Sequence, residues 1–295
     1  MNFRRLHIFK IVCESETLTE AGKKLYMTQP AISQAISELE SELNTPLFER
    51  INKKLLLTYA GEVLYQYSKR ILNLIDEART TIDDITNRNR GRLRIGASTT
   101  IGTYLLPHII GQFQKKYPTV DLPFVIDNTE VIEGLIQDHQ IDIGLVEGPI
   151  HSKVQAKPFY DDELYFICSP EHRWANKGTI EPHELESESL IMREKGSGTR
   201  EVFENVMNEH NQTYQVKHVL NNTEAIKKSV EANIGVAIIS KIAVIDEMQA
   251  GKVVNVQLNG IRFVRKLHFI YHQEKYPSQL FQEFIDTVKE CRPES

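Results

Sequence analysis

The first 58 residues show three short stretches with apolar positions at helical spacing, followed by a hairpin pattern. In the third stretch Ile32, Ile36, Leu39 and Leu43 recur at intervals of three and four, which predicts one buried helix face. Residues 47–58 then place apolar positions on both sides of a polar Asn-Lys-Lys tip. Three helices and a hairpin are therefore predicted for this region.

The segment from residue 58 to about residue 88 predicts one long helix, because its apolar positions alternate gaps of three and four. Such a seam over about three heptads, with charged flanks, favours a coiled-coil pairing with a second copy of the chain. A long helix packed on its own domain is the alternative. The seam positions are Leu64, Tyr67, Ile71, Leu74, Ala78, Ile82 and Ile85.

Beyond a polar, basic stretch at residues 87–92, strand and helix patterns alternate in two series. The first series predicts strands at 92–98, 120–126 and 141–148, with a helix to residue 117 and another over 130–137. The second predicts strands at 163–169, 189–194, 215–220 and 235–240, with helices starting at 199 and 223. A final strand pattern at 262–272 and a helix from 278 to about 289 are expected to cross back to the first lobe.

The predicted fold is α/β overall, in three parts. An all-α winged helix-turn-helix covers residues 1–58, a linker and dimerisation helix covers 59–90, and a two-lobed α/β domain covers 91–295. Lobe I takes about 91–160 and 265–295, and lobe II takes about 161–264.

Composition and charge narrow the class of protein. Apolar residues make up 41% and charged residues 25%, as in ordinary globular domains. The N-terminal charges do not fit an export signal and no apolar run nears the ~18 residues of a membrane-spanning helix, so we expect a cytoplasmic protein. The net charge of −5 requires that DNA binding be judged by region, and residues 1–58 carry eight Lys or Arg against seven Asp or Glu.

The cysteines and histidines predict neither a metal site nor catalysis. Cys13, Cys168 and Cys291 are widely spaced and lack a CxxC pattern, so buried, inert thiols are favoured over a disulfide, a zinc site or a redox sensor. The ten histidines show no ligand spacing, and His268 and His272 are predicted on one strand, too far apart to share a metal. We therefore expect no enzyme, no cofactor and no metal.

Residues 16–43 have the spacing of a helix-turn-helix, with a tight polar turn at 26–28. Thr17 followed by Glu20 predicts a capping box for the first helix. Thr28 is expected to cap the second helix, with Pro30 in its first turn.

The outward face of this second helix is polar and small, which suits entry into a DNA major groove. Gln29 and Gln34 are the predicted base readers, because Gln can pair with adenine edges. Hydroxyls on this face and basic residues on the hairpin are predicted to contact phosphates. An ordinary solvated helix is the alternative. The predicted DNA-binding residues are Thr28, Gln29, Pro30, Ser33, Gln34, Ser37, Arg50, Lys53 and Lys54.

These residues resemble the N-terminal pattern of the LysR-type transcriptional regulators, and the resemblance extends along the whole chain. The matching positions include Ala21, Leu25, Thr28, Gln29, Pro30, Ala31, Ser33, Leu39, Glu40, Leu43, Leu47, Phe48, Arg50, Leu57, Thr58 and Gly61. The chain departs from the family at Glu16 and Asn44, where glycine is usual, at Gly22, where alanine is usual, and at Asn52, often arginine. Asn44 can adopt the left-handed conformation that glycine would supply, whereas Asn52 would weaken a contact of the wing.

The resemblance implies a homodimer formed through the linker helix, usually paired further to a tetramer, on a dyad-symmetric promoter site. The implied partners are double-stranded promoter DNA, a second copy of the chain, a small-molecule effector and RNA polymerase. No association with a membrane is expected.

The two predicted lobes resemble the periplasmic solute-binding fold, in which a ligand sits at the carboxyl ends of strands between the lobes. Two polar strand-to-helix loops, at 98–100 and at 193–200, are therefore candidate effector contacts. Ordinary helix capping and an ordinary glycine turn are the alternatives. The predicted effector-binding residues are Ser98, Thr99, Thr100, Gly148, Ser197, Gly198, Thr199, Arg200, Thr223 and Glu224.

The 193–200 loop and residues 221–241 resemble a branch of the family that includes regulators of carbon fixation and sulfur assimilation, which implies an anionic or zwitterionic effector. The predicted function is a sequence-specific transcription regulator whose promoter contacts change when an effector binds between the lobes. The alternative is a stand-alone solute-binding module without specific DNA binding.

Overall fold

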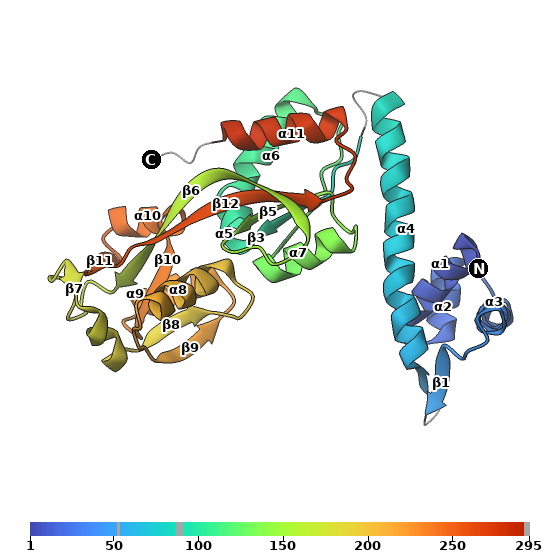
Figure 1. Cartoon of the computed structure of the whole chain (residues 1–295), viewed down its shortest axis with the longest axis horizontal. Coiled ribbons are helices and arrows are strands. Elements are labelled where there is room, and N and C mark those ends of the chain that lie inside the picture. The colour runs from blue at the N-terminus through green and yellow to red at the C-terminus, as the bar shows by residue number, and fades with distance from the viewer. Residues whose placement is uncertain (52–53, 87–90, 292–295) are drawn as a thin grey trace. The chain divides into compact units, whose positions relative to one another are not determined.

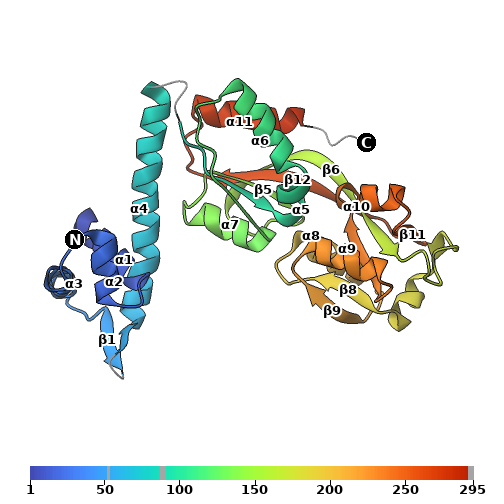
Figure 2. The ribbon, with the colours of Figure 1, turned by 180° about the vertical axis from the view of Figure 1, so that it is seen from behind.

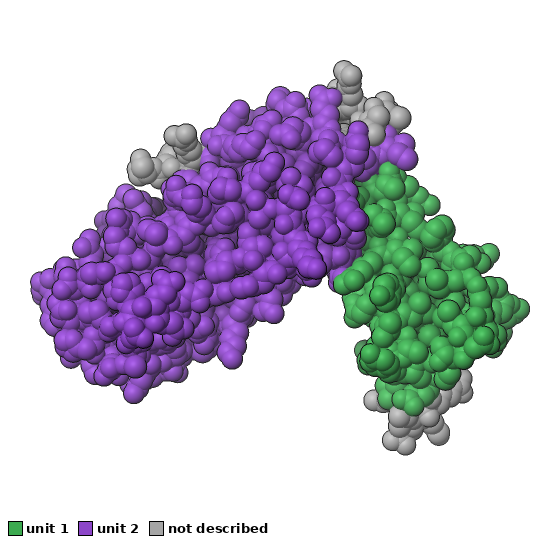
Figure 3. Space-filling model, in the orientation of Figure 1, with its two compact units in different colours: residues 1–80 green, residues 81–295 purple. Residues whose placement is uncertain are grey.

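The structure is a computed structural model that describes residues 1–51, 54–86 and 91–291, without the side chains of residues 50–54 and 84–86. It divides into two compact units, residues 1–80 and residues 81–295 (Figure 3).

The first unit contains the three predicted helices, the hairpin and the beginning of the long helix (Figure 1). Its core joins Phe9, Ile32, Leu39 and Leu47, whose side chains are all 1% exposed or less. The elements are α1 (Phe3–Cys13), α2 (Leu18–Leu25), α3 (Gln29–Leu43), β1 (Phe48–Ile51), β2 (Lys54–Leu57) and α4 (Tyr59–Thr86).

The turn between α2 and α3 is tight. Tyr26 ends α2 in the left-handed region, with φ of 54°. A Cβ on Gly22 would lie 2.7 Å from the Met27 carbonyl oxygen, so glycine permits the close return of the chain. Asn44 ends α3 at φ of 51°, the left-handed conformation predicted for it.

Three local predictions differ from the structure. Thr28 is the N-cap residue of α3, but its side chain makes no capping hydrogen bond within the described part of the chain. Thr17 accepts from the Glu20 amide as predicted, while the Glu20 carboxylate accepts from the Glu16 amide instead of completing the box at Thr17. Leu43 is 37% exposed because the chain turns at once after it and Leu47 fills the core instead.

The second unit starts with a parallel α/β lobe. Strands β3, β4 and β5 pair in parallel, with α6 and α11 packed on one face and α7 on the other. The predicted single helix to residue 117 is two helices, because Leu105 interrupts it and Pro107 lies in the first turn of the second. The elements are β3 (Ile95–Ser98), α5 (Thr99–Tyr104), α6 (Leu106–Lys116), β4 (Phe124–Asp127), α7 (Thr129–Gln137), β5 (Ile143–Glu147) and α11 (Gln279–Glu290).

The second lobe continues the same sheet, in the order β4-β3-β5-β12-β6-β10-β8-β9. Strands β7, β11, helix η1 and helix α10 were not predicted. The elements are β6 (Val154–Cys168), β7 (Thr179–Ile180), η1 (Pro182–Ser187), β8 (Leu190–Arg193), α8 (Gly198–Glu209), β9 (Val216–Leu220), α9 (Thr223–Glu231), β10 (Val236–Ser240), α10 (Lys241–Gln249), β11 (Val254–Leu258) and β12 (Phe263–His272).

Two long strands connect the lobes. Strand β12 pairs with β6 along its whole length and also with β5 of the first lobe (Figures 1 and 2). After it, α11 packs its Phe284 against Phe113 of α6, with ring centroids 5.3 Å apart. The predicted return of the chain to the first lobe is confirmed.

Candidate functional site

The outward surface of α3 carries the predicted DNA-contacting side chains together. Gln29, Pro30, Ser33, Gln34 and Ser37 are all exposed, and Thr28 is exposed just before them. Ile32 and Ile36 on the opposite face are buried in the core of the unit, so this core fixes which face of α3 is presented. The surface has the size and polarity that suit a major groove.

The hairpin that follows α3 is anchored by Glu40. Its Oε1 accepts hydrogen bonds from the Leu47 amide at 2.8 Å and the Phe48 amide at 3.2 Å. The backbones of β1 and β2 pair in register from Phe48 opposite Leu57. The remaining predicted DNA contacts, Lys53 and the side chains of Arg50 and Lys54, lie outside the described residues.

The predicted effector site in the second unit is organised around a buried carboxylate that the sequence did not single out. Ser98 donates to Glu147 Oε2 at 2.6 Å, and Thr100 donates to Glu147 Oε1 at 2.9 Å. The three side chains are buried. The two hydroxyls that were predicted to meet an effector anion are therefore already occupied by a carboxylate of the chain.

Arg265, on the strand β12 that connects the two lobes, also faces this carboxylate. Its guanidinium hydrogen-bonds Asp162 Oδ2 at 2.7 Å and Thr199 Oγ1 at 2.8 Å, and lies 3.5 Å from Glu147 Oε1. Burial raises the pKa of Asp162, against the opposing effect of the Arg265 cation. Arg265 Nη2 and Ser197 Oγ are buried without a hydrogen-bond partner among the described residues, so this centre offers two unused donors.

A second arginine, Arg193 at the end of β8, bridges the two lobes. Its Nη2 donates to Thr99 Oγ1 at 3.1 Å, and its Nη1 lies 3.4 Å from Thr223 Oγ1. Glu194 pairs with the same guanidinium at 2.8 Å. The Arg193 guanidinium thus contacts two predicted effector residues, Thr99 from one lobe and Thr223 from the other.

The backbones of the two lobes meet at a pair of glycines. A Cβ on Gly198 would lie 1.8 Å from the Glu147 carbonyl oxygen, and one on Gly148 would lie 2.9 Å from Gly198 Cα. The Glu130 amide also donates to the Gly196 carbonyl at 3.2 Å. Only residues without a side chain permit this approach, so the two glycines predicted as effector contacts also allow the lobes to meet.

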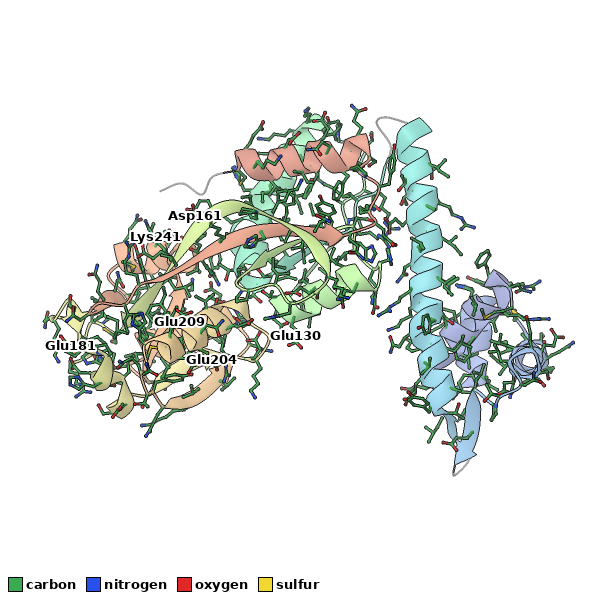
Figure 4. All side chains as sticks on the ribbon, viewed as in Figure 1. Glu130, Asp161, Glu181, Glu204, Glu209 and Lys241 are labelled. Atoms are coloured by element: carbon green, nitrogen blue, oxygen red, sulfur yellow. The ribbon has the colours of Figure 1, made fainter. Side chains whose placement is uncertain are left out.

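Two predicted effector residues are engaged by partners outside the Glu147 centre. Arg200 donates from Nε to Glu204 Oε1 at 2.7 Å along α8 (Glu204 is labelled in Figure 4) and from Nη1 to the Arg193 carbonyl. Glu224 is exposed, accepts from the Tyr104 hydroxyl and pairs with Lys227 at 2.8 Å. The charge expected from Arg200 comes instead from Arg193 and Arg265.

The residues that sequence reasoning missed are Glu147, Asp162, Arg193 and Arg265. The sequence carries a signal for two of them. Glu147 ends an apolar strand next to Gly148, and Arg193 ends another apolar strand shortly before the glycine loop. Of these four residues, Asp162 and Arg265 line a groove of about 700 Å³, together with residues that include Gly148 and Val202.

Across residues 1–51, 54–86 and 91–291, no group of three or more His, Cys, Asp or Glu side chains is placed to hold a metal ion. Burial raises the pKa of Cys168 to about 11 and that of Cys13 to about 12, so both are protonated at neutral pH. None of the described helices has the length and apolar character that crossing a membrane requires.

Two family models cover most of the chain. Residues 3–62 match a bacterial regulatory helix-turn-helix protein model, lysR family, and residues 86–292 match a LysR substrate binding domain model. A probable RuBisCO transcriptional regulator of Guillardia theta is 33% identical over 294 residues, covering 96% of this chain and 95% of that protein.

Solved structures share the fold. Full-length CbnR complexed with its target DNA is 21% identical with a TM-score of 0.72, covering 98% of this chain and 99% of that one. The CcmR regulatory domain of Synechocystis PCC6803 in complex with 2-PG is 28% identical with a TM-score of 0.63, covering 68% of this chain and 96% of that one.

Proposed function

The chain belongs to the LysR family of bacterial regulatory helix-turn-helix proteins, and on this premise we propose that it reads promoter DNA with α3 and adjusts its promoter contacts when a small molecule binds between its two lobes. The observation that carries the proposal is the exposed polar face of α3, from Thr28 to Ser37, held by a buried core on its other side. The relatives are regulators by name, and catalysis is not part of the proposal.

We propose Gln29 and Gln34 as base readers, because their amides stand exposed near the start of α3. Thr28, Ser33 and Ser37 are proposed phosphate contacts, since hydroxyls donate to phosphate oxygens. Arg50, Lys53 and Lys54 of the hairpin would add the positive charge that a unit with little net charge needs. A cytoplasmic location follows from the same proposal, because bacterial promoter DNA lies there.

Self-association through α4 is part of the proposal. Tyr67, Leu74 and Ile82 leave 57%, 50% and 61% of their surface exposed, at spacings of seven and eight along one helix. Apolar side chains repeating at this spacing are typical of a helix that pairs with a second helix. A dimer would also present two copies of α3 to a dyad-symmetric site, and two dimers would form a tetramer.

We infer an effector that carries an acidic group together with hydrogen-bond donors, as a zwitterion does. The unused donors Arg265 Nη2 and Ser197 Oγ suit an anionic group, while the buried Glu147 carboxylate requires a donor from any ligand that displaces Ser98 or Thr100. The CcmR domain binds 2-PG and the Guillardia relative is a probable RuBisCO regulator, so carbon metabolism is the favoured pathway and 2-PG the first ligand to test.

The experiment is an electrophoretic shift of the chain's own upstream promoter DNA at one fixed salt concentration. The intact chain is compared with a variant carrying Gln29→Ala and Arg50→Ala, because phosphate contacts depend on salt and must not vary between lanes. A specific shift that the variant loses supports the proposal, and 2-PG is then titrated against it. No specific shift, with small-molecule binding retained, would favour a stand-alone solute-binding module.

A further inference from the structure

Helices α1 and α3 pack against each other (Figure 1), and hydrogen bonds between side chains link α1 to the outward face of α3. Gln34 Nε2 donates to Glu38 Oε1 at 3.0 Å, one turn further along α3. Arg5 of α1 donates to Glu38 Oε2 at 2.5 Å and to Glu42 Oε2 at 3.1 Å. One oxygen of Glu38 is thus engaged by a cation from another helix, and the other by a proposed base reader.

These contacts determine how the Gln34 amide is turned. The hydrogen bond from Gln34 and then the Arg5 guanidinium lower the pKa of Glu38, so it is an ionised acceptor at neutral pH. A reversed amide would place the Gln34 carbonyl oxygen against this carboxylate, which repels it. The amide nitrogen therefore stays on the Glu38 side.

A fixed amide has a consequence for base recognition. A Gln amide has two N–H donors and one carbonyl acceptor, and Glu38 holds one donor. In the major groove adenine presents an acceptor, N7, beside a donor, N6, whereas guanine presents two acceptors, N7 and O6. The donor and the acceptor that remain on Gln34 match adenine, while guanine would require both donors.

We propose that Glu38, held in place by Arg5, is a positioning residue that keeps the Gln34 amide oriented to read adenine and disfavours guanine at the same base pair. The inference rests on the proposed function, because it takes Gln34 as a base reader. It adds that the specificity of α3 depends on a residue of α1, which does not itself carry a proposed base contact.

The test compares Glu38→Ala with Glu42→Ala in the full chain. Each variant removes one α3 carboxylate that pairs with Arg5, and both side chains are exposed (43% and 39%), but only Glu38 contacts Gln34. Each protein selects bound duplexes from one library of random DNA sequences, and sequencing gives the adenine-to-guanine preference at every position. Removal of a carboxylate should strengthen binding to all duplexes in both variants by a similar factor.

The expected result is a fall of about tenfold in adenine preference at one position for Glu38→Ala and an unchanged preference for Glu42→Ala. Glu38→Gln retains an acceptor oxygen and should keep most of the preference, and Arg5→Ala should lower it in part. In a Gln34→Ala background, Glu38→Ala should produce no further change. Unfolding curves of all variants check that the unit is intact.

An unchanged adenine preference in Glu38→Ala would overturn the inference, as would a further fall in the Gln34→Ala background, which would assign the effect to Glu38 itself. A wild-type chain that selects no sequence at all would instead overturn the proposed function. The two failures are therefore distinguishable in the same experiment.

Discussion

The Ser98 hydroxyl donates a 2.6 Å hydrogen bond to the Glu147 carboxylate, and both side chains are buried where strands β3 and β5 end. The carboxyl ends of parallel strands are where ligands bind in open α/β sheets. Here the chain places its own carboxylate at that point, so an effector bound at the proposed site would have to compete with Glu147 for the hydroxyls or hydrogen-bond to Glu147 itself.

Ser98→Ala should destabilise the second unit by about 1–3 kcal/mol, because it leaves a buried carboxylate oxygen without its donor. Urea unfolding followed by the fluorescence of Trp174, the single tryptophan, measures this free energy. Ser229→Ala is the control, since the Ser229 hydroxyl donates to the Ala225 carbonyl one turn earlier in α9, in an exposed bond, and its effect should stay within about 0.5 kcal/mol. Equal stability of the two variants would show that Glu147 does not need Ser98.

Gly198→Ala should disrupt the junction of the lobes. Its Cβ would lie 1.8 Å from the Glu147 carbonyl oxygen, a backbone atom that no side-chain rotation can move away. We expect a loss of about 1–3 kcal/mol in the unfolding free energy and a weaker response of promoter binding to effector. Gly111→Ala on α6 is the control, because among the described residues a Cβ there would meet no atom within 4 Å beyond its chain neighbours and the adjacent backbone of the helix, and it should stabilise the helix slightly. A Gly198→Ala chain as stable as wild type would contradict the close contact.

The helix-turn-helix and the order of the lobes were predictable from sequence, because both are encoded by local apolar spacing. The start of β6 was not, because residues 154–162 pair with β12 as a ribbon whose exposed side chains, such as Gln155 and Lys157, carry no apolar run. Helix α10 was also not predicted. Its buried residues are the neighbours Ala243 and Val244, which do not repeat at helical spacing. Short-range pattern does not reveal such tertiary pairing.

The candidate sites also differ in whether local spacing or tertiary pairing brings their residues together. The α3 surface lies within one helix, so the spacing of its residues predicted it. The proposed effector centre brings Glu147 and Arg265 together across more than a hundred residues, through the pairing of β12 with β5 and β6. The sequence indicated the hydroxyls at each strand end, but not the buried charges that already contact them.

Asp142→Asn should destabilise lobe I by about 3 kcal/mol near neutral pH, because it breaks a buried ionic cluster. Asp142 accepts from the Arg94 side chain at 2.9 Å and 3.0 Å and from Lys275 at 2.7 Å. Burial alone would raise the pKa of Asp142, but these cations outweigh it and lower the pKa.

The pH dependence of this effect follows from the direction of the shift. A carboxylate whose pKa is lower in the folded state than in the unfolded state adds to the free energy of unfolding. This contribution is complete above the unfolded-state pKa of about 3.9, and it is lost as the pH falls through the folded-state pKa. The difference between wild type and Asp142→Asn in urea unfolding should therefore shrink below about pH 4. Asp121→Asn removes an exposed pair with Arg92 and should cost less than about 1 kcal/mol. A difference that grows on acidification would refute the assignment.

Leu74→Glu should weaken self-association of the chain by more than tenfold. Leu74 is 50% exposed on α4, and a Leu buried between two helices contributes about 1.5–3 kcal/mol that a charged side chain loses. Sedimentation over a range of protein concentrations measures the dissociation constant directly. Gln66→Glu adds the same charge to an exposed position of α4 outside the seam, so it should leave the constant unchanged. If both variants associate as the wild type does, the copies pair through another surface. If both variants dissociate, the added charge causes the dissociation, and the result does not assign the contact to the seam.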